Sequence, residues 1–133
     1  MEKCIFCEIS KSNIKSYKVY ENEKVFAFFD IHPISKYHTL VIPKNHYKNI
    51  FEIPAKELQE VISAVKELSI LYNQKLGIEN IQIISSNGVE AQQDVPHIHF
   101  HIVPRSNNDG QDIKWTTHPE FVAEYEQLLE KLK

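Results

Sequence analysis

The stretch PHIHFHIVPR, residues 96–105, restricts what this chain can fold into more than any other segment. Histidines stand at positions 97, 99 and 101, and apolar side chains fill the positions between them. Because successive side chains of a β-strand point to opposite faces, the alternation predicts a strand over residues 97–103 with one imidazole face and one apolar face. The apolar face is expected to pack against a helix, so the imidazole face must line a polar site.

Four further strands are predicted from segments of alternating or β-branched residues bounded by turn signals. Two of them lie in residues 17–31 around the polar turn 21–23, a third lies in residues 37–46 and should end at Pro43, and a fourth lies in residues 81–88. Strands that follow one another with hairpin-like connections favour an antiparallel sheet.

Two helices are predicted from apolar residues spaced at i, i+3 and i+4. The first covers Pro54 to Leu76, with proline suited to a first helical turn and Gly77 suited to the position after the last turn. The second lies in residues 118–133, where six apolar side chains share one face. Five antiparallel strands and two main helices place the chain in the α+β class.

Length and composition fit one domain, residues 1–133. The chain is 42% hydrophobic and 25% charged with a net charge of −3, and its scattered basic residues argue against a surface for extended nucleic acid. No apolar run approaches the roughly 18 to 20 residues of a membrane span, and the N-terminal residues lack the basic-then-apolar pattern of a signal peptide. We therefore expect a cytoplasmic protein with no membrane partner.

Three imidazoles on one strand face admit three interpretations: a solvated face, metal ligation, or catalysis at an anionic centre. Neighbouring imidazoles can divide the roles of nucleophile, general base and phosphate contact near neutral pH. Ligation of one ion by all three is awkward, because same-face neighbours are about 6.5 to 7 Å apart along a strand. The preceding loop supplies Asn87, Gln93 and Asp94, which suit a phosphate or polyol site.

These residues resemble the signature of the histidine triad (HIT) family of nucleotide hydrolases and transferases, His-φ-His-φ-His-φ-φ with φ hydrophobic. The signature is complete in residues 97–103, and the likeness extends over residues 4–105. The other matching segments, in the family's order, are CIFCEI at the N-terminus, VFAFFDIHP (25–33), HTLVIPKNH (38–46) and SNG (86–88). The resemblance implies a HIT-like sheet with flanking helices and a homodimer whose sheets join across a two-fold axis, with residues 106–133 following the core.

The resemblance also implies a covalent mechanism. The middle histidine, His99, would attack the α-phosphorus of a nucleoside phosphate derivative, and water would release the nucleoside monophosphate from the nucleotidyl-histidine. His101 and His38 match the histidines that contact the α-phosphate and stabilise charge on its oxygens. A backbone carbonyl is expected to hold the far nitrogen of the nucleophilic ring in its protonated form.

Substrate-binding residues are implied in the same way. Asp30 matches the acidic residue that binds the ribose hydroxyls, since a carboxylate accepts two hydrogen bonds. Asn87 and Gln93 match loop positions near the phosphate and the leaving group. The positions that match those enclosing a purine base, each of which would serve equally as ordinary core, are Ile5, Phe6, Ile9, Phe28 and Ile31.

Two positions depart from the family pattern. Asp94 stands where the better-known phosphoramidases carry a serine that assists the leaving group, and a carboxylate there would act as an acid only when protonated. Pro96 stands where an aromatic residue is common. The leaving-group preference is therefore left open by the sequence.

Cys4 and Cys7 form a Cys-x-x-Cys pair, which can be redox-active, half of a zinc site or inert. Zinc needs four ligands, and the resemblance to zinc-containing bacterial HIT proteins implies that His46 and His97 supply the other two. Such a closed structural site would tie the N-terminal segment to the catalytic strand without taking part in the reaction. No organic cofactor is expected.

The expected function is hydrolysis of purine nucleoside phosphoramidates or related nucleotidyl conjugates. The alternatives are a dinucleoside polyphosphate hydrolase with the same active residues, a non-catalytic nucleotide-binding module, and a metal centre in which His99 and His101 ligate the ion. The intact His99 argues against the binding module, which has no need of a nucleophile.

Overall fold

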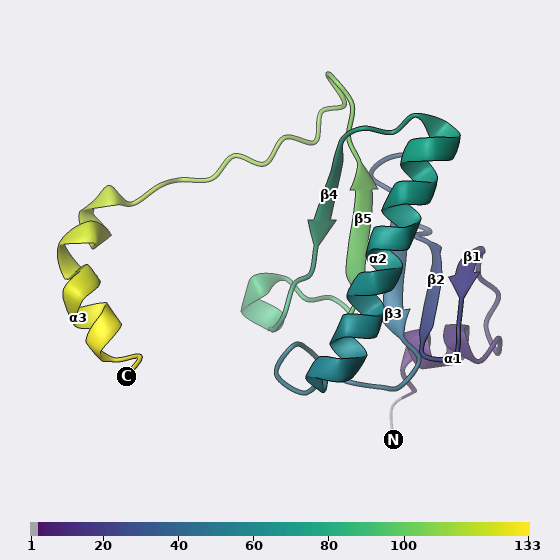
Figure 1. Cartoon of the computed structure of the whole chain (residues 1–133), viewed down its shortest axis with the longest axis horizontal. Coiled ribbons are helices and arrows are strands. Elements are labelled where there is room, and N and C mark those ends of the chain that lie inside the picture. The colour runs from purple at the N-terminus through teal and green to yellow at the C-terminus, as the bar shows by residue number, and fades with distance from the viewer. Residues whose placement is uncertain (1–2) are drawn as a thin grey trace.

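The computed structural model describes residues 3–133, and its centre is a five-stranded antiparallel sheet in the order β1-β2-β3-β5-β4 (Figure 1). The strands are β1 (Lys18–Glu21), β2 (Val25–Phe29), β3 (Thr39–Pro43), β4 (Ile81–Ile84) and β5 (Phe100–Pro104). β1 and β4 form the two edges. The predicted α+β class and the five antiparallel strands are confirmed.

The first hairpin forms where the polar turn predicted it. The side-chain oxygen of Asn22 accepts hydrogen bonds from the backbone N–H groups of Lys24 (2.9 Å) and Val25 (2.8 Å), which closes the turn between β1 and β2. Pro43 is the last residue of β3, as expected for a residue that has no N–H to donate to the ladder.

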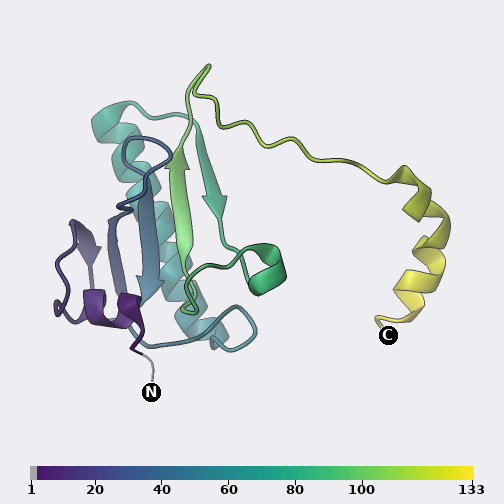
Figure 2. The same ribbon diagram turned by 180° about the vertical axis from the view of Figure 1, so that it is seen from behind.

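The long helix α2 (Ala55–Leu76) covers one face of the sheet (Figures 1 and 2). Its predicted bounds are confirmed to within one residue, because Pro54 precedes the first turn and Gly77 ends the helix with φ 68°, a left-handed conformation that suits glycine. The core under α2 consists of Val25, Ala27, Val41, Val61, Ala64, Val65, Leu68, Tyr72 and Ile102.

A short helix that the sequence patterns did not predict, α1 (Ile5–Ser10), lies on the opposite face of the sheet (Figure 2). Six residues are too few to show helical periodicity, and an isolated helix of this length is unstable in water. Packing against the sheet stabilises it instead. The buried members of this second core are Phe6, Ile9, Phe26, Phe28, Leu40 and Ile42.

The strand of the histidine segment is shorter than predicted. β5 begins at Phe100, and residues 97–99 lie outside its ladder; the backbone N–H of Ile98 donates instead to the carbonyl of Tyr47 (2.8 Å). The predicted alternation of faces still holds within β5, where Ile102 is buried under α2 and His101 pairs with Leu40 in the core of the α1 face.

The predicted C-terminal helix is also shorter, with a 3₁₀ segment Pro119–Glu124 followed by α3 (Tyr125–Glu130). Residues 110–133 are all exposed, and Figures 1 and 2 show this segment extending away from the sheet. Within residues 3–133, no helix combines the length and the apolar character needed to cross a membrane. The cytoplasmic location and the single-domain organisation stay predictions.

Candidate functional site

A pocket of about 280 Å³ lies beside α1 and the histidine segment. It is lined by all five apolar residues predicted to enclose a base, and also by Asp30, Asp94, His99 and His101. The sequence analysis assigned no site role to the remaining lining residues, most of which lie in turns or loops, while two lie in β2 and β3. These are Ile14, Lys15, Ser16, Phe29, His32, Leu40 and Val95.

The ring of His99 is buried, and its tautomer follows from one contact. Nδ1 lies 2.8 Å from the backbone carbonyl oxygen of His97, which can only accept a hydrogen bond, so Nδ1 carries the proton. Nε2 therefore holds the lone pair and lies 3.5 Å from a carboxylate oxygen of Asp94, at the pocket wall. This is the orientation that a nucleophilic imidazole requires, and the carbonyl predicted to hold the ring is that of His97.

His38 and His101 form a hydrogen-bonded pair of imidazoles beside His99. The backbone N–H of Ile34 donates to Nδ1 of His38 (3.1 Å), so the proton of a neutral His38 lies on Nε2. That Nε2–H donates to Nδ1 of His101 (2.8 Å), which leaves the proton of His101 on its own Nε2. Hydrogen bonds are therefore donated in one direction, from the Ile34 amide to His38 and from His38 to His101.

Burial keeps both rings of this pair neutral. It lowers the pKa of His38, although the nearby charge of Asp30 opposes the shift. It also lowers the pKa of His101 to about 4, and the proximity of His99 and His38 adds to the effect. Near pH 7 the two side chains therefore act as uncharged hydrogen-bond donors.

Asp30 follows β2 directly and reaches the pocket from there. One carboxylate oxygen accepts the backbone N–H of His32 (2.8 Å), and the other lies 3.5 Å from Nε2 of His38. Because each carboxylate oxygen can accept more than one hydrogen bond, Asp30 keeps accepting capacity for a diol in the pocket.

Asn87 and Gln93 do not line this pocket. The side-chain oxygen of Asn87 accepts the backbone N–H of Ile50 (2.7 Å), whereas Gln93 accepts the N–H of Gly88 (2.8 Å) and donates to the carbonyl of Lys48 (2.7 Å). These amides connect the loop before the histidine segment to the loop after β3. Their predicted contact with substrate stays a prediction. In this structure their hydrogen bonds hold the two loops together.

The four predicted metal ligands converge beside α1, with their ligand atoms all within 4.8 Å of one another. Nδ1 of His97 lies 3.3 Å from Sγ of Cys4 and 3.5 Å from Sγ of Cys7, and Nδ1 of His46 lies 3.4 Å from Sγ of Cys7. A tetrahedral zinc ion with bonds of about 2.3 Å to sulfur and about 2.0 Å to nitrogen separates S and N ligands by about 3.5 Å. The set therefore fits one tetrahedral ion.

The hydrogen bonding of the buried His97 ring suits it to bind a metal ion through Nδ1. Its Nε2–H donates to the backbone carbonyl of Pro43 (2.9 Å), so Nδ1 faces the thiols with a free lone pair. Burial lowers the pKa of His97 to about 4, which keeps the ring in the neutral form that binds metals. An outer hydrogen bond of this kind is usual for histidine ligands.

A second group of possible ligands, Asp30, His38 and His101, comes within the same distance limit. Here the hydrogen bond from the Ile34 N–H occupies the His38 Nδ1 lone pair, so Nε2 carries a proton in place of a lone pair for a metal. His99 belongs to neither group. The arrangement favours a hydrogen-bonded pair of imidazoles over the alternative of a metal centre.

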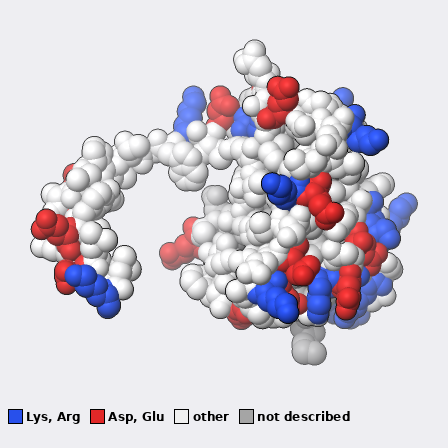
Figure 3. Space-filling model, in the orientation of Figure 1, with Lys and Arg blue, Asp and Glu red and all other residues white. Residues whose placement is uncertain are grey.

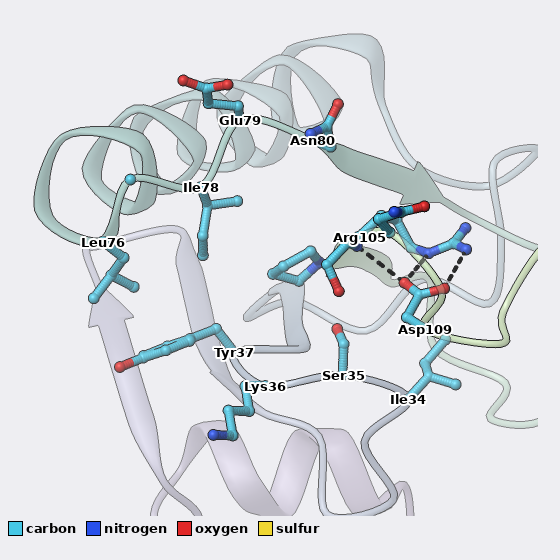
Figure 4. Close-up of a pocket in the computed structure, with 14 residues that line it drawn as sticks. Ile34, Ser35, Lys36, Tyr37, Leu76, Ile78, Glu79, Asn80, Arg105 and Asp109 are labelled. Carbon is cyan, nitrogen blue, oxygen red and sulfur yellow. Dashed lines mark hydrogen bonds and ion pairs between the residues drawn. The ribbon is translucent and has the colours of Figure 1, made fainter.

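A larger pocket, of about 700 Å³, contains none of the predicted site residues (Figure 4). It lies among loop 34–37, the end of α2 and residues 104–109. No histidine or cysteine lines it, and the guanidinium of Arg105 is engaged by Asp109. The smaller pocket is therefore the candidate active site.

Comparison with known proteins agrees with this geometry. The HIT domain family matches residues 11–108. The chain is similar to the adenosine 5′-monophosphoramidase of Schizosaccharomyces pombe, with 36% identity over 98% of each protein. A crystal structure from Streptococcus mutans has 36% identity and a TM-score of 0.91 over 99% of this chain and 84% of that one. A zinc-bound histidine triad family protein from Mycobacterium smegmatis has 28% identity and a TM-score of 0.78 over 96% of each. This chain belongs to the HIT domain family.

Proposed function

We propose that this HIT protein is a hydrolase that acts at the α-phosphorus of purine nucleoside phosphoramidates or related nucleotidyl conjugates, through a covalent nucleotidyl-His99. The observation that carries the proposal is the 2.8 Å hydrogen bond from His99 Nδ1–H to the carbonyl of His97, which leaves the Nε2 lone pair at the pocket wall. The similarity to a named adenosine 5′-monophosphoramidase supports the choice of substrate.

The reaction has two displacement steps. In the first, the lone pair of His99 Nε2 forms a bond to phosphorus, and the bond from phosphorus to the leaving nitrogen breaks with its electron pair. The departing amine takes a proton from solvent. The proton on Nδ1 stays in place, and the carbonyl of His97 stabilises the positive charge that the nucleotidylated ring carries.

In the second step a water molecule attacks phosphorus and loses its proton to solvent. The electron pair of the N–P bond returns to Nε2, which restores the starting tautomer. The products are a nucleoside monophosphate and the free amine. His101 Nε2–H, polarised through His38, stabilises the phosphate oxygens during both steps, and donors of this kind contribute about 10²- to 10³-fold to rates.

The pocket accounts for nucleoside binding. Phe6 and Phe28 meet edge to face at a centroid distance of 5.6 Å on its wall, and they offer an apolar surface to a flat base. Asp30 accepts hydrogen bonds from the ribose hydroxyls. A volume of about 280 Å³ is close to the lower end of the range for pockets that bind small molecules, and it suits one nucleoside.

Zinc is the metal that we propose for Cys4, Cys7, His46 and His97. Two thiolates and two imidazoles in tetrahedral reach are a closed structural zinc set, and a similar protein has been solved with zinc. A bound ion would contribute folding free energy by linking α1 to the histidine segment. The substrate reacts at His99, outside this cluster.

The decisive experiment compares two substrates, an adenosine phosphoramidate and diadenosine tetraphosphate, with the parent protein and with His99→Ala. We expect the parent to prefer the phosphoramidate, and we expect His99→Ala to lose turnover while it still binds adenosine monophosphate. Mass spectrometry of the quenched parent should find the nucleotidyl group on His99. A variant that kept most of its rate would contradict the covalent mechanism, and preference for the dinucleotide would favour the polyphosphate hydrolase.

A further inference from the structure

The peptide group between His97 and Ile98 takes part in two hydrogen bonds, one at each end. Its carbonyl oxygen accepts the Nδ1–H of His99 (2.8 Å), and its N–H donates to the backbone carbonyl of Tyr47 (2.8 Å). A peptide group is planar, so the direction of its N–H also fixes the direction of its C=O. Hydrogen bonds in such a chain polarise one another, which makes the carbonyl a stronger acceptor. The carbonyl of Tyr47 therefore orients the group that sets the tautomer of His99.

This support matters because the sheet does not supply it. The pairing of β5 with its neighbours begins at Phe100, so the His97–Ile98 peptide group lies outside the ladder. Ile98 is buried, and a buried N–H without a partner destabilises the fold. Its partner, Tyr47, belongs to the β3–α2 loop, residues 44–54, which contains no helix or strand. The alignment of the histidine segment thus depends on how firmly this loop is held.

The side chain that holds the loop is Glu57, in the first turn of α2. One of its carboxylate oxygens accepts the side-chain amide of Asn45 (2.7 Å), and the other accepts the hydroxyl of Tyr47. An acid at this third helical position often bonds the N–H of the capping residue, but here that residue is Pro54, which has no N–H. Figure 1 shows the start of α2 and the start of β5 at the same end of the sheet.

Two ordinary roles for Glu57 explain less of this geometry. A negative charge stabilises a helix N-terminus, but that effect requires no contact with the loop. Figure 3 shows acidic and basic side chains interspersed over the face that α2 covers, so an acidic surface patch does not account for Glu57. Neither role requires that both carboxylate oxygens bond side chains of the β3–α2 loop.

We propose that Glu57 and Tyr47 are positioning residues for the reaction. The carboxylate of Glu57 holds the Tyr47 side chain, and the backbone carbonyl of Tyr47 then orients the His97–Ile98 peptide group against the ring of His99. Neither positioning residue lines the pocket, so both act through other groups. The inference rests on the proposed role of His99 as nucleophile. Loss of the support should lower kcat, because the Nε2 lone pair is aimed at phosphorus less often, and should leave KM nearly unchanged.

The first test measures kcat and KM for an adenosine phosphoramidate. We expect Glu57→Ala to lower kcat about tenfold and Tyr47→Phe to lower it several-fold, with KM within about twofold of the parent value. Glu57→Gln removes the charge, but its amide can still accept from Asn45 and donate to the Tyr47 oxygen, so it should keep most of the rate. The matched control is Glu60→Ala, which removes an exposed acid one turn further along α2 and should have no effect.

Two kinetic outcomes would overturn the proposal. One is an unchanged kcat in Glu57→Ala. The other is an equal loss in Glu57→Gln and Glu57→Ala, which would make the charge at the start of the helix responsible. Because His46 lies between Asn45 and Tyr47, zinc is measured in every variant. We expect Tyr47→Phe to hold as much zinc as the parent, and a loss of rate that followed loss of zinc in every variant would also overturn the proposal.

The second test does not depend on turnover. ¹⁵N chemical shifts of the His99 ring report which nitrogen carries the proton, and hydrogen exchange of the Ile98 amide reports its bond to Tyr47. In Glu57→Ala we expect the Ile98 amide to exchange about tenfold faster and His99 to become a mixture of tautomers, while amides in the middle of α2 exchange as in the parent. Unchanged exchange and an unchanged tautomer would overturn the positioning role even if kcat fell.

The two tests separate failure of this inference from failure of the proposed function. A parent that turns over no nucleotidyl conjugate, or a His99→Ala variant that keeps its rate, would contradict the proposed function. The exchange of the Ile98 amide and the tautomer of His99 would still decide whether Glu57 orients the ring.

Discussion

The backbone carbonyl of His97 accepts a hydrogen bond from His99 Nδ1 at 2.8 Å, while the His97 side chain faces the two cysteine thiols. One residue therefore belongs to the proposed zinc site and also sets the tautomer of the proposed nucleophile, His99. Phe6, between Cys4 and Cys7 in sequence, adds a second link, since its ring lies 5.9 Å from that of His97 and 5.1 Å from that of His99. His97 and Phe6 therefore place the proposed zinc site in direct contact with the pocket.

Loss of the metal should weaken nucleotide binding as well as stability. Cys4→Ser removes one ligand and loosens α1, which carries three of the apolar residues of the pocket. We expect about one zinc per chain in the parent and in His99→Ala, little or none in Cys4→Ser, and weaker binding of adenosine monophosphate by Cys4→Ser. Elemental analysis and calorimetry measure the two quantities. Metal loss in His99→Ala would point instead to a metal centre at the histidines.

Asp30 should be selective for the ribose hydroxyls. Hydrogen bonds to a charged group are worth about 1.5 to 3 kcal/mol, so Asp30→Ala should weaken binding of adenosine monophosphate by about tenfold or more. Binding of the 2′,3′-dideoxy analogue, which lacks both hydroxyls, should change much less. Equal losses for the two nucleotides in calorimetric titrations would rule out the ribose assignment.

Asp94 should bias the enzyme against anionic leaving groups. Its carboxylate lies 3.5 Å from His99 Nε2 and would repel a polyphosphate more than an amine. Because the side chain is 78% exposed, solvent weakens the effect, and we expect Asp94→Ser to raise the ratio of diadenosine tetraphosphate to phosphoramidate turnover by only several-fold. Asp94→Asn, which removes the charge and keeps the shape, is the matched control and should act in the same direction. An unchanged ratio in both variants would exclude an electrostatic role.

The free energy of unfolding should decrease as the pH is lowered, partly because of His101. Its pKa drops from the ordinary 6.5 to about 4 on folding, so between these pH values the unfolded chain binds a proton that the folded chain does not. The stability due to the neutral ring is complete above about pH 6.5 and is lost as the pH falls toward 4.

A comparison of His101→Gln with the parent isolates the contribution of His101 to the pH dependence of stability. The proposed metal ligands are present in both proteins, so their protonation contributes equally to the two. Urea unfolding from pH 7 to 4 should show a smaller decline in the unfolding free energy for His101→Gln, by about 1 to 2 kcal/mol after allowance for partial exposure of the ring. Parallel declines would mean that His101 is not buried as a neutral ring.

Much of the sheet could be predicted because its signals are local. The turn at Asn22 and the stop at Pro43 depend on the chemistry of single residues. The start of β5 could not be predicted, because residues 97–99 alternate like a strand while their backbone bonds elsewhere, as Ile98 does to Tyr47. Helix α1 was missed because its stability comes from packing against the sheet rather than from its own six residues.

The sequence by itself determined which side chains share a strand face and which family pattern they complete, since backbone geometry gives a strand a period of two whatever surrounds it. Only the tertiary structure decided where protons lie on the imidazoles, because the spacing of residues does not record that the Ile34 amide and the His97 carbonyl lie against these rings. It also decided that Asn87 and Gln93 hydrogen-bond to a neighbouring loop and that residues 110–133 are exposed. Contacts between segments distant in the chain depend on how the whole molecule packs, and no local spacing records them.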